Sequence, residues 1–199
     1  MKKIITISRE FGSGGRSVGR LLAERLGYNF YDSSIVDKVA VESGYHKDFI
    51  KDHAEYASSS HSFVFSFYRT NAVIGNGTSI YDEIFIAQQK VILDIASKEN
   101  AVIVGRCADY ILRDNKDVFN VFIYSDLEKR KENIINEYGE IEDESIDKRI
   151  KEKDKKRKLY YKTYTGREFG EVKNYHIALD SSKLGIDTCV KILYDIIGE

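Results

Sequence analysis

A glycine-rich turn near the start of the chain carries the residues best suited to bind phosphate. It reads EFGSGGRS over residues 10–17, after an apolar run at 4–8 that predicts a β-strand and before a segment of helical period. In such a turn, glycines allow successive backbone N–H groups to point at phosphate oxygens where the helix begins. The residues expected to bind the phosphates of a nucleotide are Gly12, Ser13, Gly14, Gly15, Arg16 and Ser17.

The turn departs at two positions from the common phosphate-loop pattern, G-x-x-x-x-G-K-S/T. Glu10 stands where the first glycine is expected and Arg16 where the lysine is expected, whereas Ser17 supplies the hydroxyl that joins Mg²⁺. Because arginine is a permanent cation with a planar fork, Arg16 can still grip two phosphate oxygens. Two interpretations stay open here: a phosphate-binding loop, which the flanking strand and helix favour, and a glycine-rich turn that merely closes tightly.

Length and composition limit the class of protein. The 199 residues suffice for one α/β domain with a buried core and are short for two. The net charge of −1 argues against a surface that coats nucleic acid, and no apolar run approaches the roughly 20 residues of a membrane span. We therefore expect neither a nucleic-acid nor a membrane partner, while a homo-oligomer is allowed. Cys107 and Cys189 suit a reduced compartment, and a start that runs directly into a strand pattern predicts a cytoplasmic protein.

Five short apolar, β-branched runs predict the strands of a core sheet. They lie at residues 4–8, 28–32, 101–105, 119–124 and 175–180. Because longer segments of helical period separate them, the sheet should be parallel, with helices on both faces. We expect a single domain over residues 1–199, whose core comprises 1–32, 99–125 and 175–199.

Two long insertions interrupt this alternation. Residues 33–98 are too long for a simple crossover and contain a loop-like middle at 53–79. An insertion of this size is typical of a functional subdomain or lid. The second insertion, 126–174, separates its charges: residues 137–147 hold six acids and no base, and 148–158 hold eight bases and two acids. The basic stretch predicts a helix that either closes over phosphates or presents a solvated face balanced by the acids.

Four stretches together resemble the cytidylate-kinase-like branch of the P-loop nucleoside monophosphate kinases. They are ISREFGSGGRSVGRLLAERLG, NFYDSSIVDKVAVESG, AVIVGRCADYIL and the tail from VFIYSDLEKR through YHIALDSSKLG, in the expected order over nearly the whole chain. This branch carries an SRxxGSGGR-type loop, so arginine in place of lysine is typical of it. The resemblance implies an α/β, three-layer P-loop NTPase fold with a five-stranded parallel sheet, a helical monophosphate-binding insertion at 33–98 and a mobile lid at 126–174.

The resemblance also implies ATP-dependent phosphoryl transfer to a nucleoside monophosphate, CMP or dCMP, with ATP and Mg²⁺ on the glycine-rich loop. In cytidylate kinases the third strand ends in Gly-Arg-Asp, whose arginine and aspartate hold the acceptor. Here the matching residues are Gly105, Arg106 and Cys107, so the carboxylate is missing and Asp109 is the candidate replacement. The substrate-binding candidates are therefore Asp32, Arg106 and Asp109, and Ser181 matches the turn that commonly lies beside adenine.

Phosphoryl transfer requires in-line positioning and positive charge around the transferred group. The cations that the resemblance assigns to this task are Arg16, Arg106, Arg130, Lys153 and Arg157. Two alternatives to a cytidylate kinase stay open. The first is a kinase for another small phosphorylated or hydroxylated acceptor, which Cys107 and the insertion at 45–80 favour. The second is a nucleotide-binding sensor without turnover, which the unusual Glu10 and Arg16 would allow.

Overall fold

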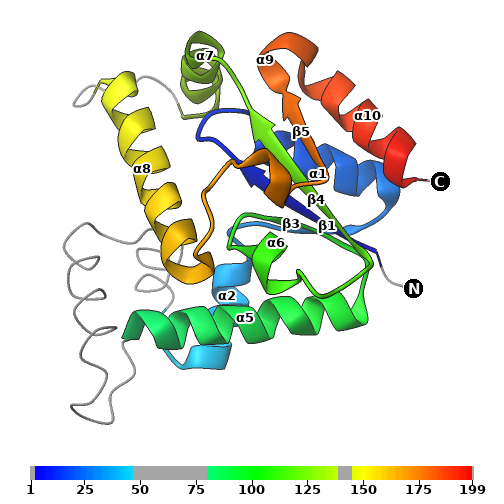
Figure 1. Ribbon diagram of the computed structural model, residues 1–199, viewed down its shortest axis with the longest axis vertical. Helices are drawn as coiled ribbons and strands as arrows, with labels where there is room; N and C mark the ends of the chain where they lie inside the picture. The colour runs from blue at the N-terminus through cyan, green and yellow to red at the C-terminus, as the bar shows by residue number, and fades with distance from the viewer. Residues whose placement is uncertain (1–2, 47–79, 139–144, 199) are drawn as a thin grey trace.

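One parallel sheet of five strands organises the computed structural model, which describes residues 3–46, 80–138 and 145–198 (Figure 1). The strands are β1 Ile4–Arg9, β2 Asn29–Tyr31, β3 Ala101–Val104, β4 Val118–Tyr124 and β5 Ile177–Asp180. Their order across the sheet is β2-β3-β1-β4-β5, and every neighbouring pair is parallel. The predicted α/β fold and its five strand segments are confirmed. The loop-like middle of the first insertion, residues 53–79, lies outside the described residues.

Helices cover both faces of the sheet and produce two separate apolar cores. The helices of the first face are α1 Gly15–Leu26 and α10 Ile186–Ile197, and those of the second are α2 Ile35–Ser43, α5 Ile80–Lys98 and α6 Ala108–Ile111. In Figure 1, α2 and α5 run below the sheet while α1 and α10 lie at its upper right. All of β3 is buried because it is covered from both sides, which explains its wholly apolar sequence.

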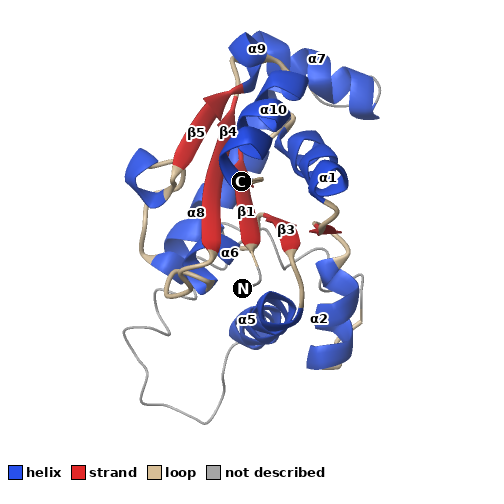
Figure 2. Cartoon of the chain, turned by 90° about the vertical axis from the view of Figure 1, so that its right-hand side faces the viewer, coloured by secondary structure: helices blue, strands red, loops and turns tan. Residues whose placement is uncertain are grey.

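The second insertion forms two helices, α7 Leu127–Tyr138 and α8 Ile146–Thr165. Figure 2 shows α7 and α9 (Ser181–Leu184) near the ends of β4 and β5, and α5 near the opposite end of the sheet. The helix predicted over 148–158 is longer at both ends than the basic stretch. It begins early because the Ser145 hydroxyl accepts the Lys148 N–H, and it ends at Gly166, whose φ of 70° is left-handed.

The C-terminal half of α8 is packed into the fold. Tyr160, Tyr161 and Thr165 are buried, and Phe85 of α5 stacks on Tyr164 with 4.1 Å between ring centroids and 10° between ring planes. Such stacking adds to the stability gained from area burial alone. The end of α8 is thus anchored to α5, whereas its basic N-terminal half has exposed and half-buried residues around the buried Ile150.

Helix α5 alternates a buried and an exposed face along its 19 residues. Ile84 and Ile92 are buried in the core, whereas Ile86 and Leu93 on the other side are each 46% exposed. Charged residues such as Lys90 and Asp94 share that outer side. Of the helices within the described ranges, none combines the length and the apolar character that a membrane span requires.

Neighbouring residues of α5 provide a test of this packing. Ile92 is 0% exposed, so Ile92→Ala should reduce the free energy of unfolding by about 2–5 kcal/mol through lost burial and a residual cavity. Leu93→Ala, on the exposed face, should change it by no more than about 0.5 kcal/mol. Urea unfolding followed by circular dichroism measures both. Equal losses in the two variants would contradict the assignment of the faces of α5.

Candidate functional site

The glycine-rich loop joins β1 to α1, and the first N–H groups of α1 have no acceptor within the helix. The first bond of helical type runs from the Val18 N–H to the Gly14 carbonyl, at 2.9 Å. The N–H groups of Gly15, Arg16 and Ser17 therefore precede the first i→i−4 bond, and Gly14 at the N-cap has no side chain to cover them. Because the helix dipole adds positive potential at this end, the loop is suited to bind phosphate.

Close packing explains why glycine occupies the loop. A Cβ at Gly12 would lie 2.8 Å from the Arg130 carbonyl oxygen and 2.9 Å from the Ile134 side chain. A Cβ at Gly15 would lie 2.6 Å from the Cβ of Arg9. Gly12 also has a φ of 78°, which L side chains rarely adopt. The loop is consequently drawn tightly onto the end of β1 and onto α7.

Side chains from distant segments hold the carbonyl groups of the loop. Asn133 of α7 donates to the Gly12 carbonyl at 2.8 Å, and Ser181 donates to the Ser13 carbonyl at 2.7 Å. The Ser13 hydroxyl is itself buried and donates to the Glu10 carbonyl at 3.0 Å. Since these acceptors face the protein, the loop is fixed by its carbonyls. The structure thus places Ser181, expected beside adenine, directly against the backbone of the loop.

Arg16 and Asp32, two of the predicted site residues, are in direct contact. The Arg16 guanidinium donates to the Asp32 carboxylate at the end of β2 and to Glu137 of α7, at 3.4 Å from the latter. Burial opposes ionisation of Asp32, but the hydrogen bond and charge of Arg16 outweigh it, so the pKa of Asp32 falls below its ordinary 3.8. In this state two carboxylates balance the cation that takes the place of the lysine.

Arg130 and Asp154 together clamp the residue that enters the loop. Arg130 donates to the Phe11 carbonyl at 2.6 Å and pairs with Asp154, which accepts the Phe11 N–H at 2.9 Å. The Arg130 guanidinium also lies 3.5 Å from the Glu10 carboxylate, and its side chain is only 8% exposed. These contacts fit a residue that positions the loop, and a direct contact between Arg130 and phosphate stays a prediction.

The basic face of α8 lies next to the same residue. Arg157 donates to the Arg9 carbonyl at 3.3 Å, and its guanidinium carbon is 5.6 Å from the centroid of the Phe11 ring. Arg149 lies at the same distance from this ring. Lys153 is partly buried on α8, one residue before Asp154. The structure therefore brings Arg157 to the entrance of the loop, while contact of Lys153 or Arg157 with a transferred phosphate stays a prediction.

The turn after β3 contains Arg106, the predicted acceptor-binding arginine. Gly105, Arg106 and Cys107 have φ values of 76°, 63° and 53°, so three successive residues are left-handed. The Gly105 N–H donates to the Ile7 carbonyl of β1 at 2.9 Å, which ties the turn to the strand that leads into the loop. Arg106 and Cys107 are both buried, and Cys107 packs with Tyr160 of α8.

Asp109, the candidate replacement for the missing carboxylate, faces the interior. It is 2% exposed and accepts a hydrogen bond of 2.6 Å from the Tyr161 hydroxyl of α8. Burial raises the pKa of Asp109 above its ordinary 3.8, although the bond from Tyr161 opposes this. In the described geometry Asp109 connects α6 to α8, and its contact with an acceptor stays a prediction.

Three polar residues of the site were not predicted from the sequence: Asn133, Glu137 and Asp154. For two of them, the sequence position indicated a role in the site. Asn133 follows Arg130 by three residues, which puts both on one side of α7, and Asp154 is one of the two acids in the basic stretch 148–158. Glu137 lies in the acidic segment and has no spacing that indicates its partner.

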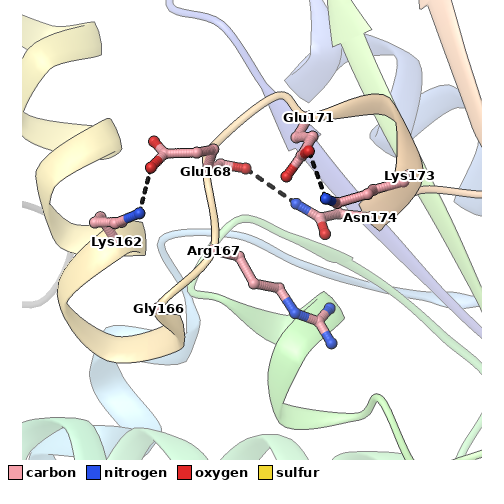
Figure 3. A pocket seen from close by; sticks show the side chains of 7 residues that line it. All are labelled: Lys162, Gly166, Arg167, Glu168, Glu171, Lys173 and Asn174. Carbon is pink, nitrogen blue, oxygen red and sulfur yellow. Dashed lines mark hydrogen bonds and ion pairs between the residues drawn. The ribbon is translucent and has the colours of Figure 1, made fainter.

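A separate hollow after α8 does not compete as a phosphate site. Its lining residues are Lys162, Gly166, Arg167, Glu168, Glu171, Lys173 and Asn174 (Figure 3). Lys162 pairs with Glu168 and Lys173 pairs with Glu171, and Figure 3 shows Arg167 directed away from these pairs. Arg167 lies 5.1 Å from the centroid of the Tyr110 ring. Because this hollow lies at the C-terminal end of α8, where the helix dipole is negative, it is a poorer anion site than the loop at the start of α1.

Comparison with known proteins places the chain among kinase folds. The model of the Cytidylate kinase-like family matches residues 4–183. The crystal structure of an uncharacterized protein from Eubacterium ventriosum ATCC 27560 is similar at 26% identity with a TM-score of 0.73, and the match covers 100% of this chain and 99% of that one. A search of proteins with curated descriptions finds no match.

Two kinases of known activity share the fold at low identity. The shikimate kinase of Bacteroides thetaiotaomicron matches at 11% identity and a TM-score of 0.56, covering 99% of each chain. The gluconokinase of Sinorhizobium meliloti 1021 matches at 14% identity and a TM-score of 0.51, covering 99% of this chain and 94% of that one. These likenesses show that the fold is that of the P-loop kinases.

The clamp on Phe11 gives a stability prediction. Arg130→Met leaves Asp154 without its cation in a largely buried place, so the free energy of unfolding should fall by about 3–5 kcal/mol. Lys129→Met is the matched control, because Lys129 is 46% exposed and pairs only with Glu132 in the described contacts. It should cost no more than about 0.5 kcal/mol. Denaturant titration of the two variants measures both free energies of unfolding. Similar small losses in the two variants would refute the structural role of the Arg130–Asp154 pair.

Because Asp109 is buried, its ionisation should make the stability of the folded protein depend on pH. A carboxyl with a higher pKa in the folded than in the unfolded chain costs stability as pH rises from its unfolded value of 3.8 towards its folded value. Asp109→Asn keeps an oxygen for the Tyr161 hydroxyl and cannot ionise. The variant should therefore be more stable than the wild type at pH 7–8, with a smaller difference at pH 5.

Thermal unfolding between pH 5 and pH 8 measures this difference. Asp114→Asn serves as the control, because the Asp114 side chain is 90% exposed and its neutralisation should give no comparable gain. A loss of stability in Asp109→Asn at neutral pH would contradict the expected cost of the buried charge.

Proposed function

The chain belongs to the cytidylate kinase-like family, and on that premise we propose that it transfers the γ-phosphoryl group of ATP to a nucleoside monophosphate, with CMP and dCMP as the expected acceptors. The observation that carries this proposal is the cradle at the start of α1. Tightly packed glycines lead into a helix start that no side chain caps, where the first i→i−4 bond begins only at the Val18 N–H, and Arg16 stands in the position of the usual lysine. This arrangement has the chemistry of a nucleotide-phosphate site.

The residues present fit ATP and Mg²⁺. The loop Gly12–Ser17 would hold the phosphates, and the Ser17 hydroxyl would join the metal ion. Mg²⁺ keeps several waters and commonly combines one or two protein oxygens with substrate phosphates, so a single hydroxyl is an adequate protein ligand. When bound, Mg²⁺ neutralises charge on the phosphate oxygens. Ser17 is partly exposed in the first turn of α1, where such a ligand is needed.

Arg16 would exchange its carboxylate partners for phosphate oxygens. Its side chain is 55% exposed, so a nucleotide can reach the guanidinium without unfolding the loop. A phosphate offers the same fork-like acceptor geometry as Asp32 and carries more negative charge. Arg157, beside the entrance of the loop, would supply positive charge from α8. Positioning and charge of this kind are what phosphoryl transfer requires of a protein.

One observation favours a second candidate acceptor. Cys107 takes the place of the aspartate of the Gly-Arg-Asp pattern and is buried, and Asp109 is bonded to Tyr161. Neither carboxylate nor thiol of this turn faces an open site in the described geometry. A small phosphorylated or hydroxylated metabolite other than CMP is therefore the alternative acceptor, with the same phosphate donor and loop.

The test is ADP formation from Mg·ATP with a panel of nucleoside monophosphates and small hydroxylated acceptors. CMP or dCMP should be phosphorylated by the wild type. Arg16→Ala should lower kcat by about 100- to 1,000-fold, the usual effect of removing one transition-state donor, and Arg16→Lys should retain more activity. Arg20→Ala is the matched control, because Arg20 is equally exposed one turn further along α1 and pairs with Glu24.

Other outcomes decide between the alternatives. Turnover only with a different small molecule would establish the second candidate acceptor. ATP-dependent thermal stabilisation without any phosphorylated product would refute the kinase and indicate a nucleotide sensor. Equal losses in Arg16→Ala and Arg20→Ala would contradict the role given to Arg16.

A further inference from the structure

The left-handed turn after β3 needs a specific support. Gly105 adopts a positive φ without strain, but Arg106 and Cys107 are L residues for which this conformation is unfavourable. Conformations of this kind persist only where surrounding contacts determine them, and they cluster at functional sites. The turn also carries Arg106 at the carboxyl end of a central strand, the edge where open parallel sheets bind their ligands.

Gln88 of α5 supplies that support. It is 0% exposed, and its Nε2 donates to the Arg106 carbonyl at 3.0 Å and to the Tyr160 hydroxyl at 3.2 Å. An amide nitrogen carries two hydrogens, so both bonds can form together. Within the described part of the chain the Gln88 oxygen accepts no hydrogen bond. The side chain therefore acts as a double donor.

The two bonds connect three segments that are far apart in sequence. Gln88 lies in the helix that ends the first insertion, Arg106 lies after a core strand, and Tyr160 lies in the helix of the second insertion. The Arg106 carbonyl belongs to the peptide bond between residues 106 and 107. Its direction is set by ψ of Arg106 and φ of Cys107, so a bond to this oxygen constrains both residues.

We propose that Gln88 is a positioning residue for the phosphoryl acceptor: it holds the Gly105–Cys107 turn left-handed, keeps Arg106 in place, and couples the turn to α8 through Tyr160. The inference rests on the proposed function, because it takes Arg106 to be the arginine that binds the acceptor. Gln88 itself acts through the backbone of the turn.

Gln88→Met tests the inference, because methionine has a similar length and no hydrogen to donate. The KM for the acceptor should rise at least tenfold, while the KM for ATP should stay within twofold. Gln89→Met is the matched control: Gln89 is the next residue of α5, and its side chain lines a surface hollow with Leu93. It should leave both KM values unchanged. An equal rise in the KM for ATP would overturn the inference, since it would indicate general loosening.

A double variant tests the backbone mechanism. Glycine at position 107 adopts positive φ without strain, so Gln88→Met combined with Cys107→Gly should recover a large part of the acceptor KM lost in Gln88→Met. If the two substitutions were simply additive, the claim that Gln88 acts through the turn would fail. If Gln88→Met does not fold, Tyr160→Phe replaces it. It removes one acceptor of the Gln88 amide, keeps the ring, and should raise the acceptor KM about threefold.

Hydrogen exchange separates this inference from the proposed function. The Ala108 N–H donates to the Gly105 carbonyl at 3.2 Å across the turn, so its exchange reports on the turn without any substrate. It should exchange at least tenfold faster in Gln88→Met and as in the wild type in Gln89→Met. Unchanged exchange overturns the inference whatever the activity. If exchange is faster in Gln88→Met but the protein phosphorylates no acceptor, the proposed function is refuted. The conclusion that Gln88 stabilises the turn then still stands.

Discussion

The ion pair between Arg130 and Asp154 is the contact on which the arrangement of the site depends. Phe11 lies between β1 and the glycine-rich loop, and both of its backbone polar groups are taken up by this pair. Because Arg130 comes from α7 and Asp154 from α8, one buried pair fixes the loop and both helices of the second insertion together. A buried pair of this kind contributes little net stability compared with apolar packing, but it costs much when half of it is lost. It therefore specifies position more than it adds to stability.

This constraint explains how Arg16 can stay exposed while the rest of the loop is fixed. The loop is held through its carbonyls by Asn133 and Ser181, so its shape does not depend on the Arg16 side chain, which is 55% exposed. The carboxylates of Asp32 and Glu137 neutralise this cation in the described state. A phosphate that replaces them meets a loop whose shape needs little change, which lowers the cost of binding.

Much of the fold followed from the sequence, because strands and helices depend on local patterns. The apolar runs of β1 and β3 and the glycines of the loop are readable within a few residues. The long-range pairs were not readable, since Phe11 and Asp154 are 143 residues apart and meet only through the topology. The left-handed conformation of Arg106 and Cys107 could not be predicted either, because glycine is the residue type that indicates a positive φ. The burial of Gln88 is a partial exception, since it continues the apolar face that Ile84 and Val91 mark on α5.

The end of α8 shows why the turn after β3 and the second insertion must be considered together. Two consecutive tyrosines make different hydrogen bonds: the Tyr160 hydroxyl accepts from Gln88, and the Tyr161 hydroxyl donates to Asp109. The Tyr161 bond reaches Asp109 directly, and the Tyr160 bond reaches the Arg106 carbonyl only through Gln88, so a shift of α8 at this end would disturb the turn. The basic half of α8 is held separately at Phe11, where Ile150 packs against the ring and Arg149 and Arg157 lie over it. Because α8 is held at both ends, any movement of this helix towards a bound phosphate has to disturb either the Arg130–Asp154 pair or the tyrosine contacts beside Arg106.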